Sequence, residues 1–262
     1  MLHLRVGVHL ASLRQPFKKS LDFAAEMNAE AIEIDARNEV RPQDLTRTAV
    51  RQIRTMLSDR NLKVCSVRFQ TRRGYQVNDD LDRRVDATKR AMEMAYELGA
   101  PIVCNSIGSL PEDPEGPEWE LMLQVLTDLG RFGQKCGAML AATTGGLATE
   151  TLKKTLELLP QGSLLVDFDP AELVIHRQSP SEAISVLANE VAHFRVRDAV
   201  QDLSQGRGIE VQVGQGSVDF PEILGKLEER QYSGYLTAQR NEPQDPVYEV
   251  QQAIEYMRNL WT

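Results

Sequence analysis

The sequence has few of the residues that build disulfide-stabilised domains. It contains three cysteines among 262 residues, Cys65, Cys104 and Cys136, and their spacing matches no motif. An odd and sparse set of this kind predicts reduced thiols, and therefore a cytoplasmic protein.

Long apolar runs and a surplus of positive charge are also absent. No segment approaches the roughly 18 consecutive apolar residues of a membrane span. The N-terminus, MLHLRVGVHLASLRQPF, lacks the charged region and apolar run of a signal peptide, and is expected to be a strand. The net charge is -8 and the pI is about 5.2, whereas nucleic-acid-binding proteins usually carry a basic footprint. We therefore expect neither a membrane nor a nucleic acid as a partner.

The chain does contain enough apolar residues for a large core, at 42 % hydrophobic content. Eight short apolar runs recur, and a helix-like segment follows each of them. These runs span residues 5–10, 31–35, 63–69, 101–107, 138–143, 163–169, 191–198 and 234–239. Eight strand–helix units predict a single (β/α)8 TIM barrel over residues 1–262, with its sites at the C-terminal strand ends.

The rival architecture, a doubly wound open sheet, lacks its commonest ligand signal, because no Gly-x-Gly-x-x-Gly follows the first strand. Two long segments, residues 107–118 and 199–218, follow the fourth and seventh strands. We expect them to be loops that rim the barrel mouth.

Four segments resemble the xylose isomerase-like barrel family, which includes sugar phosphate isomerases and epimerases and a related endonuclease branch. They are LLVDFDPAEL, HFRVRDA, VGQGSVDFPEIL and YSGYLTAQRNE, in this order. Earlier segments, TRRGY, AMEMAYELGA and TTGGLATETL, resemble one bacterial subgroup of the family. The resemblance covers most of the chain, and it implies an isomerase or epimerase acting on a sugar or a sugar phosphate.

Members of this family typically hold one divalent cation (Mn, Mg, Co or Zn) through two Glu, one Asp and one His near the ends of strands five to eight. The resemblance places Thr143, Asp169, Arg195 and Gln239 at these positions, so that only the Asp is kept. A guanidinium cannot coordinate a cation. The resemblance therefore implies a degenerate metal site, with cofactor binding absent or weak. Our hypothesis is that Arg195 occupies the metal position, pairs with Asp169, and lies close enough to Gln239 for a hydrogen bond.

Alternation along the strands places Asp167 and Asp169 on one face, and His193, Arg195 and Arg197 on one face of the next strand. We predict three acid–base residues, Asp169, Glu172 and Asp198, and five substrate-binding residues, Arg72, Arg73, Arg195, Arg197 and Gln239.

Each of these candidates also has a structural interpretation. The Asp169–Arg195 pair would simply close the barrel top, and Asp198 would cap a loop or helix. Glu172 would be a solvated residue of a first helical turn, and Arg72 and Arg73 ordinary surface arginines.

Two classes of function remain open. The first is an isomerase or epimerase in which arginines supply the positive field of the lost metal. The second is a catalytically degenerate barrel that binds a small carbohydrate or a phosphorylated ligand. An endonuclease IV-like DNA repair enzyme fits less well, because the charge is acidic and the four histidines form no cluster. Barrels of this family often pair, so the resemblance is compatible with a homodimer.

Overall fold

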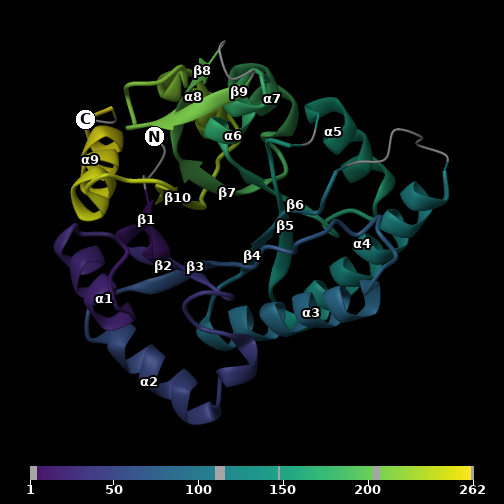
Figure 1. Cartoon of the computed structure of the whole chain (residues 1–262), viewed down its shortest axis with the longest axis horizontal. Helices are drawn as coiled ribbons and strands as arrows, with labels where there is room; N and C mark the ends of the chain where they lie inside the picture. Colours follow the sequence, from purple (N-terminus) through teal and green to yellow (C-terminus); the bar gives the residue numbers. More distant parts are fainter. Residues whose placement is uncertain (1–4, 110–115, 147, 203–206, 261–262) are drawn as a thin grey trace.

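The computed structural model describes residues 5–109, 116–146, 148–202 and 207–260. Eight parallel strands form a closed barrel in the order β1-β10-β7-β6-β5-β4-β3-β2 (Figure 1). The barrel strands are β1 (Arg5–His9), β2 (Ala31–Asp35), β3 (Lys63–Arg68), β4 (Ile102–Asn105), β5 (Met139–Thr143), β6 (Leu165–Phe168), β7 (Val191–Val196) and β10 (Tyr235–Ala238). The predicted (β/α)8 barrel is therefore confirmed.

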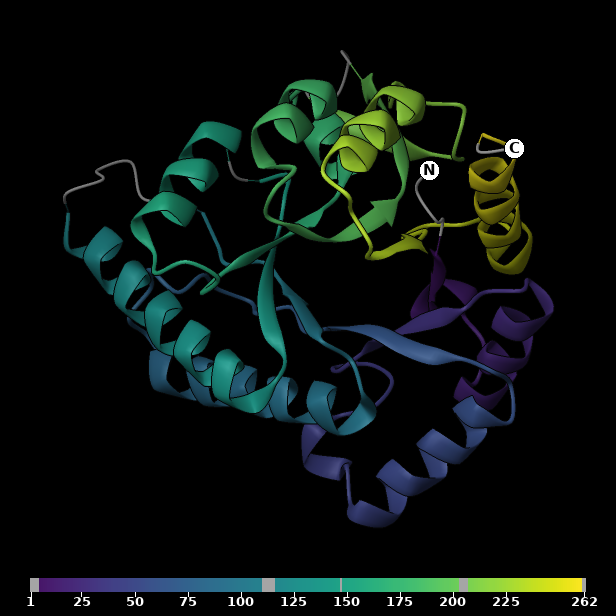
Figure 2. The ribbon, with the colours of Figure 1, turned by 180° about the vertical axis from the view of Figure 1, so that it is seen from behind.

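Helices surround the barrel and cover the outer faces of the strands, as the view from behind also shows (Figure 2). They are α1 (Phe17–Glu26), α2 (Arg47–Ser58), α3 (Leu81–Leu98), α4 (Pro117–Cys136), α5 (Thr149–Leu158), α6 (Pro170–Ile175), α7 (Pro180–Leu187), α8 (Phe220–Glu229) and α9 (Pro246–Asn259), with 3-10 turns η1 (Leu10–Leu13) and η2 (Pro42–Asp44). Among the described residues, no helix is long and apolar enough to cross a membrane.

Local sequence sets several helix ends. Asp169 and Asp245 accept hydrogen bonds from main-chain N–H groups in the first turns of α6 and α9, and a proline follows each of them. Helices α3 and α4 end at Gly99 and Gly137, whose positive φ angles of 82° and 91° favour glycine. These stop and start signals separate each helix from the strand before or after it.

The segment after β7 differs from its predicted form. Instead of a loop, residues Asp198–Asp202 and Arg207–Val211 form an antiparallel pair, β8 and β9. The long segment after β4 was also expected to rim the mouth, but residues 110–115 of it lie outside the described residues.

The barrel interior has an apolar layer and a polar layer. Ile102, Cys104 and Ala141 form a small buried cluster, separate from the main core between strands and helices. Closer to the C-terminal strand ends, the interior is filled by charged side chains instead. Gly7 makes room at the boundary, because a Cβ there would lie 2.9 Å from Thr237 Oγ1. The polar layer is where the predicted site residues lie.

Candidate active site

A ladder of ion pairs joins β6 to β7 inside the barrel. His193 Nδ1 lies 2.7 Å from Asp167 Oδ1, and Arg195 Nε donates to Asp167 Oδ2 at 2.8 Å. One step nearer the mouth, Arg197 Nη1 donates to Asp169 Oδ2 at 2.5 Å. All five side chains are buried, with at most 1 % of the residue exposed. The predicted inward faces of the two strands are therefore confirmed.

Arg195 is bound on every side by side chains of the protein. Besides Asp167, it donates two hydrogen bonds to Glu33 on β2, at 2.8 and 3.0 Å, and one to Gln239 Oε1 at 2.5 Å. Because β1 and β10 lie between β2 and β7 in the barrel, this guanidinium links two strands that do not pair with each other. The predicted contact with Gln239 is confirmed.

The predicted pairing of Arg195 with Asp169 is wrong. The carboxylate of Asp169 is held one layer higher, where Oδ2 accepts from Arg197 and Oδ1 caps α6 by accepting from the N–H of Glu172. The long side chain of Arg195 instead leans toward Asp167 and across to Glu33, which offers both carboxylate oxygens.

The charges in this layer stabilise one another despite burial. Burial alone would raise the pKa of Asp167, but Arg195 and then His193 outweigh it and lower that pKa to about 2. Burial would also raise the pKa of Glu33, but Arg195 and then His9 outweigh it and hold that pKa well below its usual value. Both carboxylates are therefore ionised at neutral pH, and both are neutralised by protein groups.

A second cluster surrounds Arg197. Its Nη1 also donates to Glu172 at 3.0 Å, and its Nε donates to Glu210 on β9 at 2.8 Å. Burial lowers the pKa of Arg197, but Asp169, Glu210 and Glu172 raise it above the ordinary value. The guanidinium thus anchors the β8–β9 hairpin over the barrel, and its Nε and Nη1 donors are engaged within the protein.

Asp198 is a loop anchor in this structure. Its two carboxylate oxygens accept from four main-chain N–H groups, those of Ala199, Gly214, Gly216 and Val218, at 2.9 to 3.2 Å. A Cβ at Gly216 would lie 2.0 Å from Asp198 Oδ1, so the close approach depends on glycine. Asp198 does not line the mouth cavity described next.

A polar cavity of about 330 Å³ opens at the mouth, over β3 to β6. Arg68 and His176 supply its cationic groups, Asp169 and Glu172 its carboxylates. Hydroxyl and amide side chains complete the wall: Gln70, Ser106, Ser109, Thr143 and Thr144. His176 Nδ1 lies 3.7 Å from Glu172 Oε2, and both side chains are partly exposed. Such a lining offers hydrogen-bond partners for a small polyhydroxylated molecule.

The structure brings together part of the predicted set. Asp169 and Glu172 line the mouth cavity, and Gln239 approaches it because its Oε1 accepts from Arg68 at 3.2 Å. Arg195 and Arg197 lie beneath it and do not line it.

Arg72 and Arg73 lie apart from this set, in another pocket outside the mouth. Two further residues were not singled out as candidates. Glu33 is the only charged residue among the apolar ones of AIEI, and Arg68 follows the uncharged run VCSV at the end of its strand. A charge inside an apolar run was the signal that would have found both.

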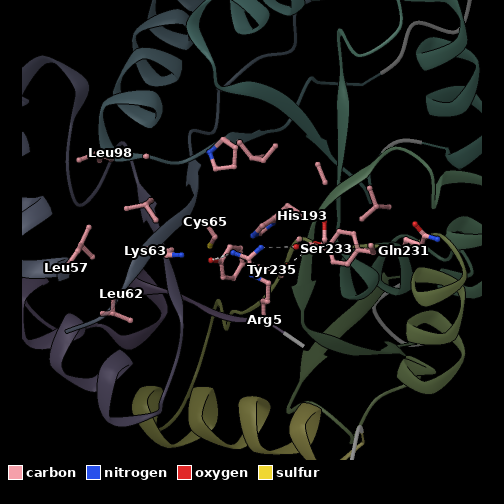
Figure 3. Close-up of a pocket in the computed structure, with 18 of the residues that line it drawn as sticks. Arg5, Leu57, Leu62, Lys63, Cys65, Leu98, His193, Gln231, Ser233 and Tyr235 are labelled. Carbon is pink, nitrogen blue, oxygen red and sulfur yellow. Dashed lines mark hydrogen bonds between the residues drawn. The ribbon is translucent and has the colours of Figure 1, made fainter. Parts of the chain in front are cut away.

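A larger cavity, of about 1070 Å³, lies at the opposite end of the barrel (Figure 3). Arg5, Lys63 and Tyr235 line it at the N-terminal ends of the strands, and it reaches inward to Cys65 and His193. In TIM barrels the chemistry is found at the C-terminal strand ends, so size alone does not make this cavity the active site. We therefore place the candidate site at the mouth.

A closed barrel of eight parallel strands with polar residues at the C-terminal strand ends defines a TIM-barrel protein with a mouth site. The profile of the xylose isomerase-like TIM barrel family matches residues 21–260, and the chain belongs to that family. Among curated proteins, the inosose dehydratase of Clostridium beijerinckii is 22 % identical over 227 residues, which cover 75 % of this chain and 74 % of the relative.

Solved structures agree in fold. A xylose isomerase domain protein from Planctomyces limnophilus superposes with a TM-score of 0.86 at 22 % identity, covering 98 % of this chain and 97 % of the other. A D-allulose 3-epimerase from Methylomonas sp., in complex with D-allulose, gives a TM-score of 0.76 at 15 % identity, with coverage of 99 % and 98 %. A family protein from Mycobacterium smegmatis, in complex with magnesium, gives 0.79 at 14 % identity, with coverage of 97 % and 95 %.

Proposed function

We propose that this barrel binds a small carbohydrate or polyol at its mouth without a divalent cation. The observation that carries the proposal is the buried guanidinium of Arg195, which donates to the carboxylates of Glu33 and Asp167 and to the amide oxygen of Gln239. The fixed positive charge of this guanidinium neutralises the buried carboxylates, as a metal cation would.

The side chains at this place do not suit a divalent cation. Thr143 donates to Asp167 at 2.7 Å, and Asp169 is already engaged by Arg197. Within the described ranges, one group of three potential metal ligands has its ligand atoms within 4.8 Å of one another: Glu33, Cys104 and His193. Both oxygens of Glu33 already accept from Arg195, whose charge would repel an incoming ion. We therefore assign no role at this site to a metal ion.

A second candidate rests on the pair at the cavity rim. Glu172 and His176 are partly exposed, belong to the same turn and face the mouth, as an acid–base pair would. With Arg68 beside them, they provide the groups for a metal-independent isomerase or epimerase. A relative in fold that is a D-allulose 3-epimerase, solved in complex with D-allulose, supports this second candidate. The inosose dehydratases among the relatives support a carbohydrate-like ligand but a different reaction.

Metal binding gives the first test. We expect MnCl₂, CoCl₂ and MgCl₂ at millimolar concentration to leave the melting temperature of the chelator-treated protein unchanged. A ligand at 100 times its Kd would stabilise the native state by about 2.7 kcal/mol, which a thermal-shift assay resolves easily. A saturable rise in melting temperature with micromolar Mn²⁺, together with one ion per chain by elemental analysis, would refute the metal-free site.

Polyol binding gives the second test. We expect isothermal titration with D-allulose, D-fructose or myo-inositol to detect a ligand, and His176→Ala to weaken its binding by about tenfold, since one or two hydrogen bonds are lost. Tyr248→Ala is the matched control, because Tyr248 is an exposed aromatic residue on α9 that does not line the cavity. A mouth site would be contradicted if none of the three compounds bound, or if His176→Ala and Tyr248→Ala lost the same affinity. Turnover that is lost in Glu172→Gln would favour the enzyme over the binding protein.

A further inference from the structure

A second pocket, of about 870 Å³, lies outside the barrel mouth and is dominated by arginine. It is formed by the loop after β2, the segment after β3 and the first half of α3, and α3 packs against η2 at its edge. Seven of its lining residues are arginines: Arg37, Arg41, Arg72, Arg73, Arg83, Arg84 and Arg90. Only two lining residues are acidic, Asp80 and Asp86. We call it the arginine pocket.

Most of these guanidinium groups are not neutralised by the protein. Arg73 pairs with the exposed Asp79 at 2.9 Å, and Arg84 donates to the main-chain oxygens of Val77 and Asp79. The other five form no ion pair with any residue that the structure describes, and all five are exposed. The buried Nε of Arg84 also has no hydrogen-bond partner among the described residues. The pocket therefore has a strong positive charge of its own, in a chain whose net charge is -8.

Stability does not explain this arrangement. Asp80, at the N-cap of α3, makes no side-chain capping bond, and the one acidic residue of the first turn, Asp82, is followed directly by Arg83 and Arg84. Positive side chains near a helix N-terminus oppose the helix dipole, and neighbouring guanidinium groups repel one another. Asp82, Asp79 and the main-chain oxygens that accept from Arg84 offset only part of this positive charge, and a local conflict that is only partly relieved is typical of a binding site.

We propose that the arginine pocket binds a small anion that carries two or more phosphate groups. Guanidinium groups bind phosphate oxygens in pairs, and several unpaired arginines around one concavity suit several phosphates. The volume lies in the range of small-molecule sites. A nucleic acid would need an extended basic stripe on a surface that is otherwise acidic, so the concave pocket favours the small ligand.

This site is separate from the mouth cavity and does not depend on the function proposed for it. The chain that leaves the strand at Arg68 runs between the mouth cavity and the arginine pocket. Arg68 and Gln70 line the mouth cavity, whereas Phe69 and Thr71 line the arginine pocket. Arg72 and Arg73, predicted to bind substrate, therefore belong to the second ligand in this proposal. A small phosphorylated molecule bound here would touch the back of the segment that forms the mouth wall.

Isothermal titration with inorganic pyrophosphate in metal-free buffer tests the proposal. We expect saturable binding that weakens steeply with added NaCl, because exposed charges are screened. The variant Arg83→Ala/Arg90→Ala removes two exposed, unpaired guanidinium groups from the face of α3, and alanine favours the helix, so the variant should fold. We expect its affinity for pyrophosphate to fall by about tenfold or more.

The control Arg51→Ala/Arg131→Ala removes the same charge from exposed positions on α2 and α4 that do not line the arginine pocket. It should bind pyrophosphate within about twofold of the parent chain. The proposal is overturned if pyrophosphate does not bind at low salt, or if both double variants lose the same affinity. It is also overturned if a single-stranded or duplex oligonucleotide binds more tightly than pyrophosphate and displaces it, because the ligand is then a nucleic acid.

Discussion

Arg195→Met is expected to lower the free energy of unfolding by about 3–5 kcal/mol or more, as the loss of one partner of a buried ion pair usually does. Arg195, Glu33 and Asp167 are all 0 % exposed, so water cannot replace the lost hydrogen bonds. Methionine keeps the unbranched stem of the arginine and removes the guanidinium group. The loss therefore combines two buried carboxylates without a counter-charge and the cavity left by the guanidinium group, and chemical denaturation of both proteins at pH 7 measures it.

A second substitution keeps this prediction testable even if Arg195→Met does not fold. Glu33→Gln/Arg195→Met removes one negative and one positive charge, and leaves Asp167 beside His193, which is 2.7 Å away. We expect this double variant to be more stable than Arg195→Met alone, although Glu33→Gln alone destabilises the parent chain. A double-mutant cycle with these three variants gives the coupling energy. Additive effects would mean that Glu33 and Arg195 do not stabilise each other.

The same ion pairs set the acid sensitivity. The pKa of Asp167 in the folded state is about 2, below its ordinary value of 3.8, so the unfolded state takes up the proton first as the pH falls. Its contribution is complete above about pH 5 and is lost progressively as the pH falls through about 4 to 2. Glu33, whose pKa is also lowered, acts in the same direction. In Glu33→Gln/Arg195→Met this acid dependence should be shallower.

Much of the fold was predictable because each strand is a short apolar run and each helix has its own boundary signals. Pro170 and Pro246 follow capping aspartates, and Gly99 and Gly137 end long helices. The β8–β9 hairpin was not predicted, because its strands are short and half exposed and carry few apolar residues. Two such strands pair only because the barrel places them side by side, and the local sequence pattern does not indicate that placement.

For the site, strand periodicity predicted which side chains point into the barrel, but not which of them pair with each other. Alternation correctly put Asp167, His193 and Arg195 inside the barrel. The choice of Asp169 as the partner of Arg195 was wrong, because an arginine side chain is long enough to cross a layer. Its second partner, Glu33, comes from a strand 162 residues earlier in the sequence. Such contacts between strands that do not pair follow from closure of the sheet and not from the spacing of residues within one strand.

Asp198→Asn is expected to destabilise the fold by about 2–3 kcal/mol, since hydrogen bonds to a charged group contribute more than neutral ones and several are lost together. The carboxylate accepts from four main-chain N–H groups, two of them the N–H groups of Gly214 and Gly216. An asparagine amide offers one acceptor oxygen where the aspartate has two, and its NH₂ would face N–H donors. Denaturant unfolding gives the change in stability, and hydrogen exchange shows whether residues 214–218 lose protection.

The same variant separates the two roles predicted for this residue. Asp44→Asn is the control, because Asp44 is exposed and its side chain makes no hydrogen bond or ion pair with the residues that the structure describes. The free energy of unfolding of this control should stay within about 0.5 kcal/mol of that of the parent chain. If Asp198 is a loop anchor, Asp198→Asn loses stability and local protection, while a ligand of the mouth cavity binds with little change. If it is instead an acid–base residue, the variant stays as stable as the parent chain and loses turnover. The four main-chain contacts favour the first result, since a carboxylate so engaged has little freedom to exchange a proton with a substrate.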